Sequence, residues 1–304
     1  MKRVLVTGAN GFVGRHLVER LARQNDVIAL DKSANMTNFP ERTKIVNADI
    51  SDKGVIRKIV ALKPDIIYHL AAISSIPFSV ENPRLTIRVN ADGTQNLLEA
   101  ARLYDVKRFI FISTSQVYGI PKYLPIDEAH PINPNNPYSV SKAIGELLTE
   151  EYNSLYSLKT TIMRPFSMFG PQQETGFVVP TMITQAISAD KIVLQNRSPI
   201  RDFLFIEDAI EALVAIIQNK DTIGKTYNLG SGEEISIGNL ANNIKELVCP
   251  KKEIEYTNVE RKVEIPKLTA NTGKIKKIGW KPKTTLKEGL IKTIKYYKSI
   301  LASK

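Results

Sequence analysis

Two short segments of this chain combine residue types and spacings that could carry out chemistry. In the first, YSVSK, Tyr138 and Lys142 stand four residues apart. On a helix this spacing puts both side chains on one face. A nearby ammonium favours the phenolate and lowers the pKa of a phenol from its usual value of about 10. Such a phenol can act as an acid or a base at neutral pH.

The second segment, TGANGFVG, places Gly8, Gly11 and Gly14 between an apolar stretch and a stretch with helical periodicity. Glycines let the backbone turn tightly and approach a pyrophosphate, and the first N–H groups of a helix can bind its oxygens. The spacing is looser than that of the usual dinucleotide fingerprint, so chance glycines in a loop are the alternative. Together with the Tyr–Lys pair, the turn predicts hydride transfer with a nicotinamide dinucleotide.

Acidic residues follow the next two predicted strands. Asp31 ends the second strand, where a carboxylate would accept hydrogen bonds from the adenosine ribose and repel the 2′-phosphate of NADP. We therefore expect NAD rather than NADP, although Lys32 weakens this preference, and the alternative role of Asp31 is to cap a turn. Asp49 and Ile50 end the third strand and are expected to hold the adenine edge, with a turn aspartate as the alternative.

Thr114 follows the fifth predicted strand, in the segment STSQVYG. Ligands collect at the carboxyl ends of parallel strands. The Thr114 hydroxyl is therefore expected to bond the substrate oxygen that Tyr138 protonates or deprotonates, while Lys142 can also bond the nicotinamide ribose. The alternative for the Tyr–Lys pair is a solvated helix face, which the upstream nucleotide turn disfavours.

Strands and helices alternate through the first half of the chain. Apolar stretches predict strands at 3–7, 27–30, 45–49, 66–70, 109–112 and 160–163. Helical periodicity predicts helices at 12–23, 85–104 and 138–156. This alternation predicts an α/β fold, a doubly wound parallel sheet of the Rossmann type with right-handed crossovers and helices on both faces.

The alternation loosens after Gly170. Later strands are expected at 192–194 and 203–206, and later helices at 178–189, 207–219, 238–248 and 285–301. We expect a NAD-binding Rossmann domain over residues 1–170 and about 201–230. A smaller mixed α/β C-terminal domain for the substrate is expected over residues 171–200 and about 231–304.

Further segments complete a pattern with these motifs. The pattern consists of Thr7–Gly14, Asp31, Asp49, His69–Ala72, Val89–Asn90, Thr114–Gly119, Tyr138–Lys142, Arg164–Pro165, Gly170–Pro171, Arg201–Phe203 and Gly279–Pro282. Together these residues resemble the extended short-chain dehydrogenase/reductase family, in its group of nucleotide-sugar epimerases and dehydratases. The resemblance covers nearly the whole chain, and UDP-hexose 4-epimerases are the members that it resembles most.

The resemblance implies roles for individual residues. It implies catalysis by Thr114, Tyr138 and Lys142. It implies that the cofactor is held by Gly8, Asn10, Gly11, Phe12, Val13, Gly14, Asp31, Asp49, Ile50, Leu70, Ala71, Ala72, Asn90, Tyr138, Lys142 and Pro165. It implies substrate contacts from Ser74, Thr114, Ser115, Gln116, Ser167, Arg201 and Arg261. The two arginines would grip the diphosphate, because planar guanidinium groups suit phosphate oxygens. No metal is expected.

Departures from the family pattern narrow the expected reaction. The 4,6-dehydratases carry acidic residues directly after the catalytic threonine, whereas this chain has Ser115 and Gln116, so dehydration is disfavoured. Ser167 stands where epimerases commonly have asparagine, which weakens the expected diphosphate contact there. The segment Ser75–Pro83 resembles hexose 4-epimerases, and Glu174–Val178 resembles 4-keto-6-deoxyhexose reductases.

We therefore expect an NAD-dependent epimerase that acts at C4 of a nucleotide-diphosphate hexose through a 4-keto intermediate, with a UDP-sugar favoured as the substrate. A 4-keto-6-deoxyhexose reductase that consumes NADH or NADPH is the alternative. The two reactions use the same catalytic residues, so the sequence hardly separates them.

Composition sets further limits. The 304 residues carry a net charge of +11, of which +10 (16 basic minus 6 acidic residues) falls in residues 245–304. This basic tail leaves an RNA-associated protein as an interpretation from another class, beside a cofactor-binding regulator without catalysis. The intact catalytic residues oppose both interpretations, and few aromatic residues lie among the lysines, so no nucleic-acid partner is expected.

Cysteine content and hydropathy bear on the location of the protein. Cys249 is the single cysteine, which excludes an internal disulfide. The chain has no apolar run long enough to cross a membrane, and a strand begins at Arg3 with no signal peptide before it. We therefore expect a cytoplasmic protein without a membrane partner.

Two predicted helices carry apolar residues beyond those that the active site needs. These residues are Leu97, Leu98 and Leu103 on one helix and Ile144, Leu147, Leu148 and Leu155 on the other. Members of the family often dimerise through such helices, so a homodimer is expected. Burial of these residues within one chain is the alternative.

Overall fold

The computed structural model describes residues 1–259 and 264–302. The chain forms two compact units. The first contains Met1–Gly119, Pro131–Pro165 and Leu213–Tyr227. The second contains Ile120–His130, Phe166–Ala212 and the described residues from Asn228 onward. The glycine turn and the Tyr–Lys pair both lie in the first unit. The expected division into a NAD-binding domain and a substrate-binding domain stays a prediction.

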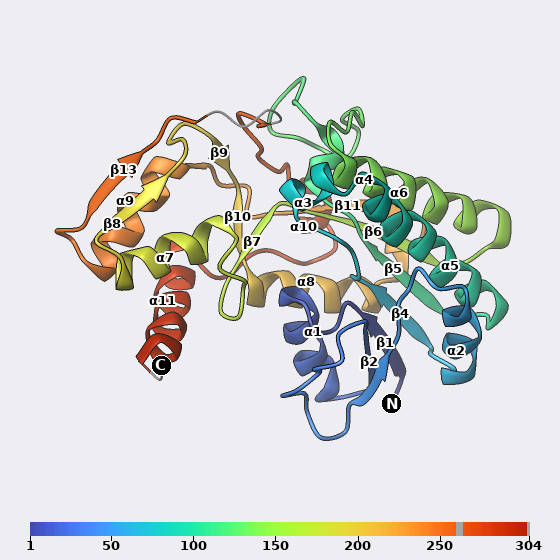
Figure 1. Cartoon of the computed structure of the whole chain (residues 1–304). Helices are drawn as coiled ribbons and strands as arrows, with labels where there is room; N and C mark the ends of the chain where they lie inside the picture. The colour runs from blue at the N-terminus through green and yellow to red at the C-terminus, as the bar shows by residue number, and fades with distance from the viewer. Residues whose placement is uncertain (260–263, 303–304) are drawn as a thin grey trace. The chain divides into compact units, whose positions relative to one another are not determined.

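A seven-stranded sheet forms the centre of the first unit (Figure 1). In spatial order its strands are β11 (Lys225–Leu229), β6 (Thr160–Pro165), β5 (Arg108–Ile112), β4 (Ile66–His69), β1 (Arg3–Thr7), β2 (Asp26–Asp31) and β3 (Lys44–Asn47). The pairings from β3 to β6 are all parallel. The strand order reverses between β1 and β4, the place where this class of sheet binds ligands at the carboxyl ends of its strands. The predicted Rossmann-type fold is confirmed.

The central strands are apolar almost throughout. Every residue of β4, β5 and β6 is buried, as are four of the five residues of β1. A parallel sheet covered on both faces requires such continuous apolar runs rather than alternation. The edge strand β3 differs, since none of its residues is fully buried.

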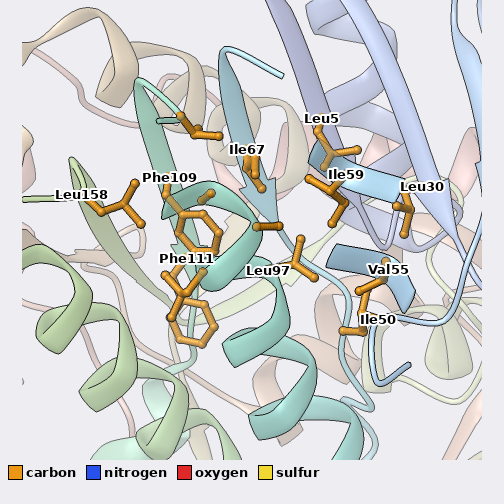
Figure 2. Packing of buried hydrophobic residues seen from close by; sticks show 14 of the residues in the cluster. Leu5, Leu30, Ile50, Val55, Ile59, Ile67, Leu97, Phe109, Phe111 and Leu158 are labelled. Atoms are coloured by element: carbon orange, nitrogen blue, oxygen red, sulfur yellow. The ribbon is translucent and has the colours of Figure 1, made fainter. Parts of the chain in front are cut away.

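One face of the sheet is covered by α2 (Gly54–Leu62), α5 (Gly93–Leu103) and α6 (Pro137–Tyr156), which lie in one layer (Figure 1). An apolar cluster fills the space between this layer and the strands (Figure 2). Leu5, Ile67 and Phe109 come from the strands, Ile59 and Leu97 come from the helices, and all five are 0% exposed. Burial of each such side chain stabilises the fold by roughly 1.5–3 kcal/mol.

The other face of the sheet packs against α1 (Phe12–Ala22), which buries Leu17 and Leu21. Side chains alternate along a strand, so Tyr68 points away from the cluster that contains Ile67. The buried Tyr68 hydroxyl donates to the carbonyl oxygen of Leu213 at 2.8 Å. Leu213 belongs to α8 (Ile206–Gln218), a helix whose residues divide between the two units.

The helix expected over 85–104 is interrupted. A π-helical turn over Arg88–Asp92 joins α4 (Pro83–Ile87) to α5. Such turns are frequently found at functional sites, and this one carries Asn90. Neither this turn nor the helices α2 and α3 (Ile76–Glu81) were predicted from the sequence.

The described part of the second unit combines small sheets with packed helices. The strands pair as β7 (Ser167–Phe169) with β10 (Phe203–Phe205), β9 (Ile200–Arg201) with β12 (Ile235–Ser236), and β8 (Lys191–Leu194) with β13 (Glu253–Tyr256). Helices α7 (Val178–Ser188), α9 (Ile237–Val248) and α11 (Leu286–Ala302) pack on one another. Strand β10 pairs with β7 in a small sheet of its own and does not join the large sheet. The chain returns to the large sheet further on, at β11, which forms one edge of it.

Candidate active site

The glycine turn joins the end of β1 to the start of α1. Gly8 has a φ of +67°, which favours glycine, and a Cβ there would lie 2.7 Å from the backbone nitrogen of Ala71. A Cβ at Gly14 would lie 2.1 Å from the carbonyl oxygen of Gly8. Gly11 has no side chain that could cap α1, so the first amides of this helix are left for a ligand. A tight turn with free amides fits the pyrophosphate of a dinucleotide.

Asp31 ends β2 beside the glycine turn. Its Oδ2 accepts a hydrogen bond from the amide of Asn10 at 3.0 Å, and its Oδ1 accepts one from the amide of Ser33 at 3.0 Å. The Arg15 guanidinium donates to the Asn10 side chain at 2.5 Å and steadies it. Asp31 therefore fastens the turn, and its oxygens retain lone pairs for ribose hydroxyls. A carboxylate at this place would suit NAD and oppose a 2′-phosphate, and this role of Asp31 stays a prediction.

Asp49 and Ile50, expected near the adenine, follow β3. The Oδ1 of Asp49 accepts from the amide and the hydroxyl of Ser51 at 2.8 and 2.7 Å, which makes a local turn. Ile50 is buried, and its carbonyl oxygen accepts from the side-chain amide of Asn96 at 2.9 Å. The turn is the alternative that the sequence left open for Asp49, and adenine contacts of both residues stay a prediction.

A buried polar chain joins the ends of β1 and β4. The Thr94 hydroxyl donates to the carbonyl oxygen of Asn90 at 2.5 Å, so it accepts from Nε2 of His69 at 3.0 Å. The His69 Nδ1 is then an acceptor for the Thr7 hydroxyl at 2.8 Å. The Thr7 oxygen in turn accepts from the amide of Ala71 at 3.2 Å. Burial holds the pKa of His69 well below its usual value, so the ring stays neutral and keeps Ala71 in place beside the glycine turn.

Helix α6 begins at a capping box. The Asn136 side chain accepts from the amide of Ser139 at 2.9 Å, and the Ser139 hydroxyl oxygen accepts from the amide of Asn136 at 3.2 Å. Pro137 occupies the first turn, where its missing N–H is not needed. This start fixes Tyr138 in the first turn of α6 and Lys142 one turn further on.

Glycine in the middle of α6 lets the helix approach β5. A Cβ at Gly145 would lie 2.5 Å from the ring of Phe111. The Nζ atom of Lys142 lies 4.2 Å from the centroid of the same ring, a cation–π contact. Lys142 is 2% exposed. Burial lowers the pKa of Lys142 to about 7, an effect that the charge of Glu146 opposes.

The Thr114 hydroxyl is a close neighbour of the Tyr138 phenol. Tyr138 is half-buried, and Thr114 is buried just after β5. Burial raises the pKa of Tyr138, and the nearby Thr114 hydroxyl offsets part of this rise. The expectation that Lys142 lowers this pKa is not met by the polypeptide alone. The physical reason is that desolvation of the phenolate outweighs the stabilisation that the neighbouring groups supply.

Asn90 connects the segment after β4 with α6. Its Oδ1 accepts from the amide of Ile73 at 2.8 Å, and its Nδ2 donates to the carbonyl oxygen of Ile73 at 3.0 Å and to the Ser141 hydroxyl at 2.8 Å. The Ser141 hydroxyl donates to the carbonyl oxygen of Tyr138 at 2.7 Å. Asn90 thereby holds the segment that follows Leu70–Ala72 in register with the helix that carries the phenol.

The remaining expected cofactor residues lie at the start of α1 or at the ends of strands in the first unit. They are Phe12, Val13, Leu70, Ala72 and Pro165. Contacts from these residues to a cofactor stay a prediction.

The expected substrate residues divide between the two units. In the first unit, Ser115 is buried and Gln116 is half-buried in the 3₁₀ turn η2 (Ser115–Tyr118), whereas Ser74 is exposed. Thr114, Ser115 and Gln116 therefore lie together after the end of β5. Ser74 belongs to a different segment, which follows β4.

The second unit holds Ser167 on β7 and Arg201 on β9. Ser167 is half-buried, and its amide donates to the carbonyl oxygen of Asp202 at 3.0 Å. The Nη1 of Arg201 donates to the carbonyl oxygen of Ile200 at 2.8 Å. Arg261 lies outside the described residues. Substrate binding by these three side chains stays a prediction.

A buried ion pair that was not predicted from the sequence lies next to Lys142 on α6. Glu146 and Arg164 approach to 2.6 Å, with side chains 1% and 4% exposed. The available signal was the spacing of Glu146, which follows Lys142 by four residues just as Lys142 follows Tyr138.

No group of three or more His, Cys, Asp or Glu side chains within 1–259 and 264–302 is placed to hold a metal ion. Among the described helices, none has the length and hydropathy needed to span a membrane.

The fold and the site together are those of a short-chain dehydrogenase/reductase. A dinucleotide turn follows β1, Thr114 follows β5, and Tyr138 and Lys142 lie on α6. Comparison with known families narrows this class. A model described as the NAD dependent epimerase/dehydratase family matches residues 4–230. The chain belongs to this family, the extended branch of the class.

Individual relatives align over almost the whole chain. A putative UDP-glucose 4-epimerase of Methanocaldococcus jannaschii is 36% identical and covers 97% of this chain and 98% of the relative. The human dTDP-D-glucose 4,6-dehydratase is 31% identical over 98% of this chain and 90% of the relative. The crystal structure of UDP-glucose 4-epimerase from Thermotoga maritima with UDP-glucose has a TM-score of 0.94 at 29% identity, covering 98% of this chain and 99% of that chain.

These comparisons confirm three predictions from the sequence. The family is the one that the motifs resemble, the chain is an enzyme of that family, and NAD is its cofactor. The relatives include both epimerases and dehydratases. The comparisons therefore establish the nucleotide-sugar family but do not distinguish between these two reactions.

Proposed function

We propose that this enzyme inverts the C4 hydroxyl of a nucleotide-diphosphate hexose, with a UDP-sugar as the substrate, through a transient 4-keto sugar. The observation that carries the proposal is the placement of the Thr114 hydroxyl near the Tyr138 phenol, with the buried Lys142 one helical turn further along α6. The likeness to two proteins named as UDP-glucose 4-epimerases supports it.

The chain's own residues would handle the proton of the C4 hydroxyl. Tyr138, as phenolate, removes this proton in one direction and returns it in the other. Thr114 bonds the same oxygen and orients it, and the Lys142 ammonium favours the phenolate by its charge. Bound at the glycine turn and Asp31, NAD would supply the acceptor and donor for the C4 hydride, and its positive charge would favour the Tyr138 phenolate.

The residues after Thr114 favour epimerisation over dehydration. Loss of water across two carbons needs an acid and a base beyond the Tyr138 phenol. Ser115 and Gln116 occupy these positions in η2, and neither a serine hydroxyl nor an amide has a pKa suited to that task. The human dehydratase relative therefore defines a rival reaction that an assay can separate.

The test is to incubate the purified enzyme, without added cofactor, with UDP-glucose, UDP-galactose and their N-acetyl and uronate relatives. We expect interconversion of one C4-epimeric pair, and NAD in stoichiometric amount in a denatured sample. A Tyr138→Phe variant removes the acid–base group, and the rate should fall by about 10²–10⁴-fold.

Three outcomes contradict the proposal. A product lighter by one water indicates a dehydratase. Consumption of NADH or NADPH with a 4-keto-6-deoxyhexose, and release of the oxidised cofactor, indicates the reductase. No reaction with any C4-epimeric pair leaves the family assignment in place and removes the proposed substrate class.

We also propose that the enzyme is a homodimer. Leu103 at the end of α5 and Leu147 and Leu155 on α6 are 55%, 65% and 67% exposed, which is unusual for leucine. Leu97 and Leu98 are 0% exposed and belong to the core of one chain, so their expected part in a dimer is wrong. Exposed apolar residues on neighbouring helices support an interface that pairs α5 and α6 with their counterparts.

A further inference from the structure

Three titratable side chains lie in a row along one face of α6. Tyr138, Lys142 and Glu146 are spaced by four residues each, so they lie on one face of the helix. Lys142 and Glu146 are 2% and 1% exposed. The ammonium therefore has the phenol one turn before it and a buried carboxylate one turn after it.

Glu146 is held by a two-pronged contact with Arg164 on β6. Nε of Arg164 donates to both carboxylate oxygens at 3.0 and 3.2 Å, and Nη2 donates to Oε2 at 2.6 Å. Burying such a pair costs desolvation that its attraction only partly offsets, and an apolar pair of similar volume is often at least as stable. The pair therefore calls for an explanation other than stability.

Arg164 also reaches the segment that begins at Thr114. Its Nη1 donates to the hydroxyl of Tyr118 at 2.9 Å, and its guanidinium carbon lies 4.9 Å from the centroid of the Tyr118 ring. Tyr118 ends η2, the turn that starts directly after Thr114. One guanidinium therefore fastens η2 to α6, the two elements whose hydroxyl and phenol form the catalytic pair.

We propose that Glu146, held by Arg164, is a positioning residue that places a fixed negative charge one turn from the Lys142 ammonium and, through Arg164 and Tyr118, holds the segment after Thr114 beside α6. The catalytic part of this inference rests on the proposed C4 epimerisation. The electrostatic part concerns Lys142 alone and does not depend on the substrate.

The surroundings of Lys142 single out Glu146. On β5 the ammonium faces the ring of Phe111, and on β4 the nearby imidazole of His69 is held neutral by burial. On α6 its neighbours are Tyr138, which burial keeps as a neutral phenol, and Glu146. Among the described residues, Glu146 is the charged group that raises the pKa of Lys142 against the effect of burial.

The first test measures the pKa of Lys142 by NMR titration of the full-length enzyme labelled with ¹³C at lysine Cε. The Lys142 signal is identified by its absence in Lys142→Met. In Glu146→Gln we expect the pKa of Lys142 to fall by about one pH unit or more, because an opposite charge at this range is lost. Glu150→Gln removes a carboxylate one turn further along α6 and is the matched control, with a smaller change expected.

A double variant separates an electrostatic role from a structural one. Glu146→Gln leaves Arg164 buried without its carboxylate and is at risk of misfolding. Glu146→Gln combined with Arg164→Met removes both charges and fills the space with an apolar chain. The double variant also removes the positive charge of Arg164, which opposes the effect of Glu146 on Lys142. If the Glu146 charge dominates, the pKa of Lys142 stays below its native value in the double variant. Full recovery of the native pKa would mean that the pair has no net charge effect on Lys142 and would contradict the proposal.

The second test uses the reaction. In the Glu146 variants the loss of kcat with rising pH should begin at a lower pH, with KM changed little, while activity at the acid end is largely kept. An unchanged pKa of Lys142 in both the single and the double variant overturns the proposal. If the native enzyme shows no epimerisation, the proposed function fails, and the NMR titration still decides the role of Glu146.

Discussion

At the scale of single residues, the site depends on a lysine that the protein keeps in an unfavourable place. Lys142 is buried against Phe111, and burial lowers its pKa from 10.5 to about 7. Because the unfolded chain binds this proton more tightly than the folded protein does, the folded protein is penalised at low pH. The penalty is present below about pH 7 and disappears as the pH rises toward the unfolded value.

The variant Lys142→Met should therefore be more stable and much less active. In the protein without cofactor, we expect its free energy of unfolding to exceed that of the native protein by a few kcal/mol at pH 6. The excess should shrink by roughly 2–3 kcal/mol between pH 6 and pH 9, at about 1.4 kcal/mol per pH unit above pH 7. Urea unfolding at both values of pH measures it, and an excess that does not depend on pH contradicts the prediction.

At the scale of elements, the turn between β1 and α1 shows how backbone packing decides which residue fits. Gly14 lies in the first turn of α1, where its Cα faces the carbonyl oxygen of Gly8. This contact brings the start of the helix as close to the strand as a dinucleotide turn requires. The glycine is needed for space and not for backbone conformation.

The variant Gly14→Ala should lose NAD and stability together. Its Cβ would stand 2.1 Å from a backbone oxygen, so the turn must open. We expect a loss of at least about 2 kcal/mol in the free energy of unfolding, in the range of overpacked sites. Gly176→Ala is the control, because a Cβ there has nothing within 4 Å. The measurements are thermal unfolding and NAD content, and native NAD content in Gly14→Ala would contradict the expected geometry.

At the scale of the whole molecule, the proposed dimer explains why leucines remain exposed on two adjacent helices of a well-packed unit. Leu147 and Leu155 are already exposed in one chain, so changing them to lysine should not disturb its core. In a symmetric dimer the same surface patch of both subunits forms the interface, so each substitution would bury two new positive charges there.

The variant with Leu147→Lys and Leu155→Lys should be a monomer. Light scattering on the native enzyme is expected to give twice the 34.0 kDa of one chain, and on the variant the mass of one chain. Ile291→Lys, which changes an exposed residue of α11, is the matched control and should remain a dimer. A native mass of 34.0 kDa at every protein concentration would exclude the proposed dimer.

Local patterns in the sequence determined much of this protein. The glycine spacing, Asp31 and the Tyr138–Lys142 spacing each depend on a few neighbouring residues, so they could be recognised without coordinates. Six strands of the large sheet and most helices followed for the same reason, because burial on both faces of the sheet leaves continuous apolar runs. The strand β11 and the short strands β7, β9, β12 and β13 were not predicted. These local patterns predicted the family and its NAD cofactor, and the family comparison confirmed both.

Tertiary structure alone decided the electrostatics of the site. The pairing of Glu146 with Arg164, and the neutral His69 between Thr7 and Thr94, join residues that are far apart in the chain. The same holds for the raised pKa of Tyr138, which the Tyr–Lys spacing predicts with the opposite sign. A pKa depends on how completely water is removed from a group, and that follows from the packing of distant segments rather than from spacing along one helix.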